Sequence, residues 1–171
     1  MTKILFIQGI HNFSLREQFV KDVKEATGLE VVYFPYLYGL MDTDKQLELI
    51  GKVNAHIAGD DSRYIILAHS FGGILAYCLE EKTYEKVEQI ITFGAPHQVQ
   101  FAWFKDTLSK LPYRTEVDVP LQKSCGFYFD FTVPFFFTRH PHAKSHTNHI
   151  GSHTSVPNRK KFFRKLILGH I

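Results

Sequence analysis

The sequence has few cysteines and little net charge, and each shortage excludes a class of protein. Its 171 residues include two cysteines, Cys78 and Cys125. Two are too few for the disulfide framework of a small secreted domain, so we expect both to be buried free thiols. The formal net charge of +3 is too small to indicate nucleic-acid binding.

Long hydrophobic runs are also missing. No stretch approaches the roughly 20 apolar residues that cross a bilayer, so stable membrane insertion is not expected. The apolar run from Ile4 to Ile7 is shorter than a signal-peptide core and is followed directly by Gln8 and Gly9. We therefore expect a cytoplasmic protein. No internal repeat or low-complexity linker divides the 171 residues, which predicts a single domain over 1–171.

Aromatic residues are abundant, at 15% of the chain with sixteen Phe. The segment around residues 64–76 is the most informative part of the sequence. Tyr64 to Ala68 is an apolar run typical of a strand buried on both faces, and a Leu- and Ala-rich helical pattern follows from Phe71 to Glu81. Between them stands Ala-His-Ser-Phe-Gly, a variant of the G-x-S-x-G nucleophile elbow. This pattern predicts that Ser70 lies in a strained strand-to-helix turn with its hydroxyl exposed as a nucleophile.

Strand and helix patterns alternate along the chain. Strands are predicted over 3–8, 30–34, 63–68, 87–93 and 125–129. A capping box at Ser14 to Glu17 begins one predicted helix, and Thr43 to Gln46 begins another whose Leu47, Ile50 and Ile57 face inward. A final helix runs from Pro157 to about Leu168, with its basic face in solvent and Phe162 and Leu166 buried. This order predicts an α/β fold with a mostly parallel sheet, which binds ligands beyond the carboxyl ends of its strands.

A serine nucleophile needs a base and an acid to orient it, in the chain order Ser, Asp or Glu, His. Asp130 follows the fifth predicted strand and is the preferred acid. Asp118 precedes that strand and is a weaker candidate. Five histidines fall between residues 140 and 153. The base should lie on the connection to the last helix, which leaves His149 and His153 as candidates.

Three segments carry a resemblance to a known family. Residues 148–156 (Asn-His-Ile-Gly-Ser-His-Thr-Ser-Val) resemble the G-H-I-G histidine segment of small lidless bacterial lipases of the α/β-hydrolase fold. Ile-Gln-Gly-Ile at residues 7–10 is similar to their V-H-G-I oxyanion segment, and Gly-Ala-Pro-His at 94–97 to their G-T-P-H. The resemblance implies a minimal α/β-hydrolase fold with helices on both faces of the sheet, and places His149 at the base position, with His153 as the alternative.

The resemblance also implies a mechanism. A Ser70, Asp130 and His149 triad would cleave a small ester or other acyl substrate through an acyl-enzyme, without cofactor or metal. The backbone amides of Ile10 and Phe71 would form the oxyanion hole. Residues 99–123 would form either a small cap over the site or an amphipathic core helix. The aromatic run at 127–137 would line an acyl pocket or fill the core.

Two other functions are compatible with the sequence. The histidines at 140–153 begin with His-x-His and could build the metal site of a metallohydrolase, although the acidic residue that such a motif needs is absent. A binding protein without catalytic activity could also use the same fold.

Overall fold

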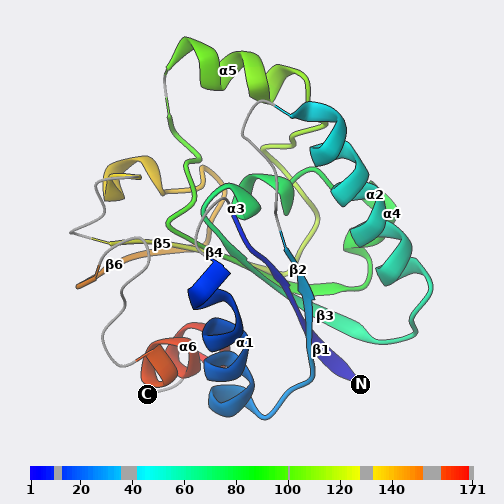
Figure 1. Ribbon diagram of the computed structural model, residues 1–171, viewed down its shortest axis with the longest axis vertical. Coiled ribbons are helices and arrows are strands. Elements are labelled where there is room, and N and C mark those ends of the chain that lie inside the picture. The colour runs from blue at the N-terminus through cyan, green and yellow to red at the C-terminus, as the bar shows by residue number, and fades with distance from the viewer. Residues whose placement is uncertain (10–12, 36–41, 100, 128–132, 152–158, 170–171) are drawn as a thin grey trace.

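The computed structural model describes residues 1–9, 13–35, 42–99, 101–127, 133–151 and 159–169, except for the side chains of 13–16 and Phe135. Strands and helices alternate in these residues (Figure 1). The elements are β1 Thr2–Ile7, α1 Phe13–Thr27, β2 Val31–Phe34, α2 Thr43–Ala58, β3 Arg63–His69, α3 Phe71–Leu75, α4 Glu81–Tyr84, β4 Val87–Phe93, α5 Ala102–Ser109, β5 Leu121–Phe127, the 3-10 turn η1 Phe135–Phe137, β6 Ser145–His149 and α6 Arg159–Leu168.

The six strands in the described part of the chain form one parallel sheet in the order β2-β1-β3-β4-β5-β6. β3 lies in the interior of this order. Its residues from Tyr64 to His69 are buried, as expected for a strand covered on both faces. β6 is an edge strand with a polar sequence and only half-buried or exposed residues. The predicted α/β class with a parallel sheet is confirmed.

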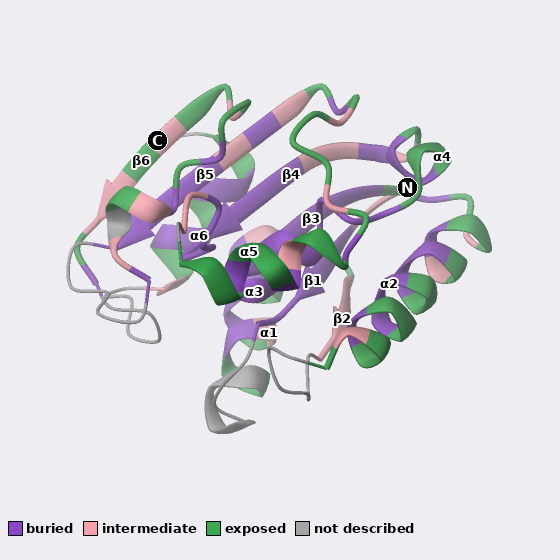
Figure 2. Ribbon diagram, turned by 90° about the horizontal axis from the view of Figure 1, so that it is seen from above, coloured by how far each residue is buried: buried purple, intermediate pink, exposed green. Residues whose placement is uncertain are grey.

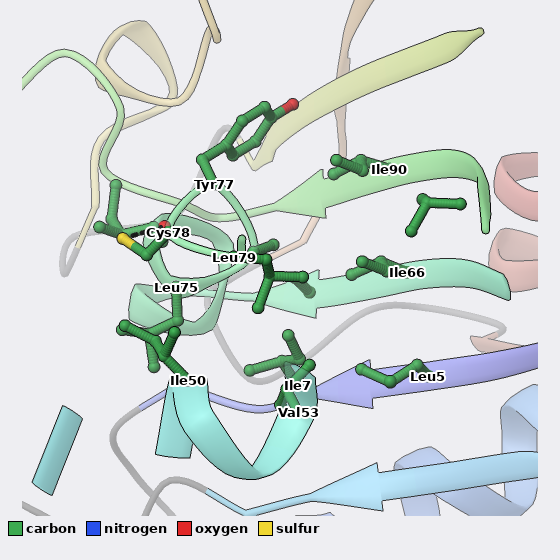
Figure 3. Close-up of a cluster of buried hydrophobic side chains, with 14 of the residues drawn as sticks. Leu5, Ile7, Ile50, Val53, Ile66, Leu75, Tyr77, Cys78, Leu79 and Ile90 are labelled. Carbon is green, nitrogen blue, oxygen red and sulfur yellow. Dashed lines mark hydrogen bonds between the residues drawn. The ribbon is translucent and has the colours of Figure 1, made fainter. Parts of the chain in front are cut away.

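Two apolar clusters cover the two faces of the sheet. On one face α1 and α6 pack together, and Phe19 and Phe163 contact each other with ring centroids 5.7 Å apart (Figure 1). On the other face, Ile50 and Val53 of α2 and Leu75 of α3 meet strand side chains such as Ile66 (Figure 3). Helices on both faces were predicted and are confirmed.

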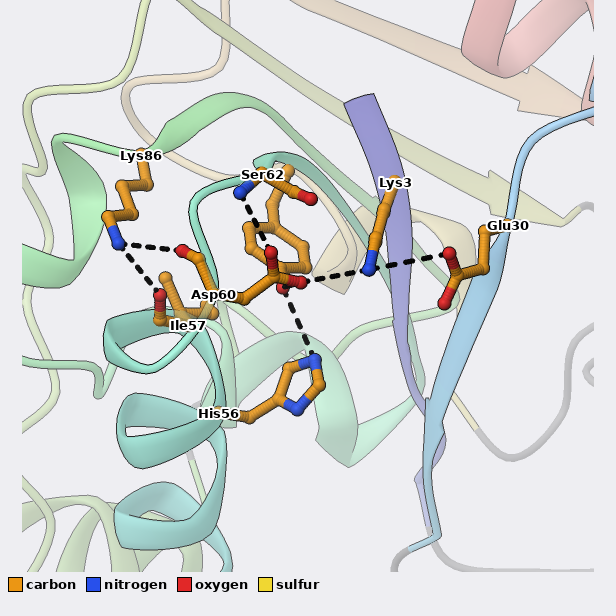
Figure 4. Close-up of polar contacts among 8 residues, drawn as sticks. Lys3, Glu30, His56, Ile57, Asp60, Ser62 and Lys86 are labelled. Atoms are coloured by element: carbon orange, nitrogen blue, oxygen red, sulfur yellow. Dashed lines mark hydrogen bonds and ion pairs between the residues drawn. The ribbon is translucent and has the colours of Figure 1, made fainter. Parts of the chain in front are cut away.

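The amino edge of the sheet is held by a polar network centred on Asp60 (Figure 4). Its carboxylate accepts hydrogen bonds from Lys3 Nζ at 2.9 Å, Tyr64 OH at 2.7 Å and the Ser62 amide at 2.9 Å. These donors, led by Tyr64 and Lys3, hold the pKa of Asp60 well below its usual range. The network joins β1 and β3 at the end opposite to Ser70, so it contributes to the scaffold and is distant from the predicted site.

Several predicted boundaries are wrong. The helix after Ser70 ends at Leu75 and does not reach Glu81, because turns occupy residues 76–79. β5 begins at Leu121, earlier than predicted, and β6 was missed because its polar sequence lacks the apolar pattern of a buried strand.

Both predicted helix starts are displaced. α1 begins at Phe13, so Ser14 is inside the helix and is not its cap. Asp42 caps α2 by accepting from the Lys45 amide at 3.2 Å, in place of the predicted Thr43. Leu47 is 41% exposed and does not face inward, whereas Ile50 and Ile57 are buried as predicted.

The two cysteines and the last helix agree with the sequence analysis. Cys78 and Cys125 are free and buried. In α6, Phe162 and Leu166 are buried and the lysines are exposed. None of the helices in the described ranges is long and apolar enough to cross a membrane.

Candidate active site

Ser70 occupies the sharp turn between β3 and α3. Its backbone has φ 54° and ψ −132°, and among the described residues it is the single non-glycine residue with positive φ. The turn is fixed from both sides, because the Ser70 amide donates to the Phe93 carbonyl at 3.0 Å and the Gly73 amide donates to the Ser70 carbonyl at 2.9 Å. Strain of this kind costs about 1–3 kcal/mol and persists where the surrounding structure imposes it. The strained turn predicted from the sequence is confirmed.

Glycines let the strand β1 and the helix α3 approach this turn. A Cβ on Gly9 would lie 2.5 Å from Ser70 Cβ and 2.7 Å from the Phe71 amide nitrogen. A Cβ on Gly72 would lie 2.4 Å from the Ile7 carbonyl oxygen. No side chain fits at these distances, so the turn requires glycine at both positions. Ala68 is fully buried in β3, so alanine fits where the commonest motif has glycine.

The Ser70 side chain is less accessible than the sequence suggested. The residue is 6% exposed and therefore buried. Phe104 of α5 packs edge-to-face against Phe71, with ring centroids 6.2 Å apart. α5 therefore lies directly beside the residue that follows Ser70. Sequence reasoning left the place of α5 open and missed this contact.

His69, next to Ser70, is held by aromatic rings on the α1 face. It is 3% exposed, and its ring lies 4.9 Å from Phe93 and 5.9 Å from Phe19, measured between centroids. This packing holds the residue that precedes Ser70 in place. Sequence reasoning could not find this role, because it depends on two elements distant in the chain.

His140 and His97 form a buried aromatic cluster. The His140 ring stacks on Tyr77 at 3.9 Å with an interplanar angle of 12°, and His97 meets His140 edge-on at 4.8 Å. His97 Nε2 lies 3.0 Å from Thr92 Oγ1, and its Nδ1 lies 3.4 Å from Tyr113 OH. His140 and His97 are thus part of the core, which the sequence did not predict.

Burial sets the protonation of these two histidines. It lowers the pKa of His140 to about 4, with His142 adding a smaller effect. Burial, with His140 and His146 nearby, also lowers the pKa of His97 well below its usual value. Both are therefore neutral at pH 7, because burial disfavours the charged imidazolium.

His149 is the last residue of β6 and pairs with Phe127 of β5. Its Nε2 lies 3.0 Å from Thr147 Oγ1, and its ring meets Phe162 of α6 edge-on at 5.0 Å. Burial, then Lys165 and His146, lowers its pKa. In the strand order, β6 is separated from β3 by β4 and β5.

The other predicted site residues fall into two groups. Ile10, Asp130 and His153 lie outside the described residues. Asp118 precedes β5 and lines a polar pocket with Arg114 and Glu81, at the amino edge of the sheet. β5 spans seven residues, so about 20 Å separates that edge from the edge at which Ser70 lies. Asp118 is therefore too far from Ser70 to orient a histidine that acts as its base.

The described ranges contain no group of three or more histidine, cysteine, aspartate or glutamate residues that could hold a metal ion. His142 has a single acidic contact, with Nδ1 3.4 Å from Glu116 Oε1. The four histidines at 140–149 are separated: His140 is in the core cluster, His142 is exposed in a turn, and His146 and His149 are in β6.

Comparisons with known proteins agree with this architecture. Residues 39–123 match a family model described as the PGAP1-like alpha/beta domain. No curated protein sequence matches the chain.

Solved structures with the same fold include three bacterial proteins. An extracellular alpha/beta-hydrolase from a Paenibacillus species is 13% identical, with 99% of this chain and 98% of that chain covered and a TM-score of 0.68. The Bacillus licheniformis lipase BlEst2 is 14% identical, with 98% and 90% covered and a TM-score of 0.69. The esterase domain of a Rhodothermus marinus protein is 14% identical, with 98% and 84% covered and a TM-score of 0.64. The chain has the α/β-hydrolase fold.

Proposed function

We propose that the protein is a serine hydrolase that cleaves carboxylic esters, with Ser70 as the nucleophile. The strained backbone of Ser70, at the carboxyl edge of a parallel sheet, is the observation that carries the proposal. Such a turn aims a serine hydroxyl away from its own strand and helix, which a merely structural serine does not need. The names of the B. licheniformis lipase and the R. marinus esterase domain add support for ester substrates.

The oxyanion of the tetrahedral intermediate would be bound by the amides of Phe71 and Ile10. A Cβ on Gly9 would lie 2.7 Å from the Phe71 nitrogen, so the chain that leads into Ile10 passes directly beside this amide. The Phe71 amide also starts α3, where backbone N–H groups carry partial positive charge. Each well-placed donor of this kind stabilises the transition state by about 2.7–4 kcal/mol.

Asp130 would orient the base. It stands three residues after Phe127, the end of β5, and β5 is two strands from β3 at the same edge of the sheet. With Asp118 at the opposite edge, Asp130 is the acid that the topology supports. Asp130→Asn should keep the fold and lower turnover by orders of magnitude, because the wrong imidazole tautomer would be stabilised.

His149 and His153 are the two candidates for the base, and the strand order favours His153. Adjacent strands lie about 4.8 Å apart, so β6 runs roughly 14 Å from β3, farther than the side chains of a serine and a histidine can bridge. The chain that leaves β6 at His149 returns to α6, where Phe162 and Phe163 pack on Phe93 of β4. His149 pairs with β5, and its ring contacts Phe162, so it is held on β6 at this distance and His153 remains as the candidate.

The nucleophile is tested with a fluorophosphonate probe and mass-spectrometric mapping of the labelled peptide. We expect labelling of Ser70 in the folded protein and no labelling in Ser70→Ala. Ser145→Ala, at an exposed position where β6 begins, is the matched control and should label like the natural chain. Labelling at another residue, or esterase activity unchanged in Ser70→Ala, would contradict the proposal.

The base is tested by comparing His149→Ala with His153→Ala in pre-steady-state acylation. The variant that removes the base should lower the acylation rate by at least about a hundredfold. We expect this loss in His153→Ala and a small effect in His149→Ala. The reverse result would assign the base to His149. Equal and full activity in both variants would exclude a base from this segment.

A further inference from the structure

Three exposed aromatic residues and one half-buried one form a continuous surface beside the candidate site, which we call the aromatic patch. It consists of Phe101, Trp103, Phe136 and Phe137. Phe101 stacks on Trp103 at 6.3 Å and contacts Phe137 at 6.5 Å, and Phe137 contacts Phe136 at 4.5 Å, all measured between centroids. Phe101 is 57%, Trp103 48% and Phe136 57% exposed.

The patch joins two segments that are distant in sequence. The Gln98 amide donates to the Phe137 carbonyl at 2.9 Å, which holds η1 against the start of the α5 segment. α5 is amphipathic: Phe104 and Thr107 are buried, while its outer face is exposed (Figure 2). The rings are therefore supported by a packed helix, and their exposure is a property of the fold.

The surroundings of the patch are cationic. Residues 101–110 and 133–139 contain Lys105, Lys110 and Arg139 but a single carboxylate, Asp106, which gives three positive charges against one negative. Asp106 is occupied by Lys110, with Nζ 2.7 Å from Oδ2. Lys105 and Arg139 are exposed, and within the described residues neither forms an ion pair.

We propose that the aromatic patch is a docking surface for an anionic lipid bilayer, on which the protein lies peripherally. Tryptophan and phenylalanine with adjacent lysine and arginine are the side chains that favour the headgroup region of such a surface. α5 is eight residues, or about 12 Å, long, so it can enter the interface but not cross the bilayer. Because the flanking side chains are positively charged, an anionic bilayer fits the aromatic patch better than an uncharged apolar partner does.

Docking would place the candidate site at the lipid surface. Trp103 and Phe104 contact each other at 5.6 Å, and Phe104 contacts Phe71 on the inner side of α5. One helix thickness therefore separates the exposed rings from the elbow. The proposal itself does not depend on catalysis, because binding requires only the rings and the cations.

The test uses Trp103 as the reporter, since it is the one tryptophan in the chain. On titration with vesicles of phosphatidylcholine and phosphatidylglycerol, its emission should shift to the blue and be quenched by brominated lipid. Flotation of the same mixtures gives the fraction bound. Ser70→Ala should bind like the natural chain, which separates this result from failure of the proposed catalytic function.

Variants locate the surface. Phe101→Ser combined with Phe136→Ser should weaken binding at least tenfold, and Lys105→Gln or Arg139→Gln by about fivefold each. Leu47→Ser removes another exposed apolar side chain, from α2, and should have no effect. Near-ultraviolet circular dichroism checks that each variant is folded.

Three results would overturn the proposal. One is unchanged emission in the presence of vesicles. Another is binding to anionic vesicles that is as strong as that of the natural chain, either in the double phenylalanine variant or in both cation variants. The third is a dimer in sedimentation, in the absence of lipid, that the double variant dissociates, because it would assign the patch to a second copy of the chain.

Discussion

The close approach of α3 to β1 should make Gly72 one of the least replaceable residues in the chain. A Cβ at Gly72 would lie 2.4 Å from the Ile7 carbonyl oxygen, 2.9 Å from the Ile7 carbonyl carbon and 3.0 Å from the Gln8 carbonyl carbon. All three are backbone atoms, of the last residue of β1 and of the residue that follows it, and they cannot rotate away as a side chain could. Gly72→Ala must therefore push α3 off the strand.

The expected cost combines overpacking with displacement of the elbow. Overpacking of a buried site costs about 1–3 kcal/mol in the free energy of unfolding. For a chain of 171 residues this corresponds to a melting temperature lowered by about 2–4 °C per kcal/mol. Moving α3 also moves the Phe71 amide, so esterase activity should fall further than the loss of folded protein explains.

Gly51→Ala is the matched control. Gly51 lies in α2, and nothing lies within 4 Å of a Cβ built on it. The same substitution there should stabilise the protein by about 0.5–1 kcal/mol, because alanine favours the helix. Urea unfolding and thermal melting measure both variants. If Gly72→Ala is as stable as the natural chain, or if both variants shift in the same direction, the packing argument is wrong.

Three further predictions rest on single residues. Ser70→Gly should be about 1 kcal/mol more stable than Ser70→Ala in urea unfolding, because glycine adopts φ 54° without strain; equal stabilities would argue against strain at the elbow. Burial lowers the folded-state pKa of His140 to about 4, so the unfolded chain takes up the proton first, and stability should fall as pH drops from about 6.5 to 4. His140→Phe, which keeps a ring against Tyr77, should reduce that slope, and an unchanged slope would exclude His140 as its source. Burial raises the pKa of the Cys78 and Cys125 thiols, so neither should react with Ellman's reagent at pH 8 until the protein unfolds; rapid reaction of the native protein would contradict their burial.

Much of the fold could be predicted because its central strands carry a strong local signal. β1 and β3 contain continuous apolar runs, Ile4–Ile7 and Tyr64–Ala68, and the turn at Ser70 has a pattern that dictates its backbone. β6 was missed because its residues are only half-buried or exposed, and a strand at the edge of the sheet with so little burial needs no apolar sequence. The helix after Ser70 was predicted too long because residues 76–79 are buried with apolar side chains, which look alike in a turn and in a helix.

Only the part of the candidate site that lies in or next to a predicted strand could be predicted from the sequence. The elbow and the edge at which Ser70 lies follow from the strand pattern. The position of the base does not, because His149 and His153 are four residues apart and only the place of β6 at the edge of the sheet separates them. The contact of Phe104 with Phe71 and the enclosure of His69 arise from packing between distant elements, for which the sequence holds no local signal.

The central claim is that Ser70 attacks an ester and becomes acylated. Rapid quenching after mixing with p-nitrophenyl butyrate, followed by mass spectrometry of the digested protein, tests it most directly. The account predicts a transient butyryl group on the peptide that contains Ser70, a burst of nitrophenol of matching size, and neither in Ser70→Ala. Ester hydrolysis without an acylated serine, or a butyryl group at another residue with Ser70→Ala fully active, would contradict it.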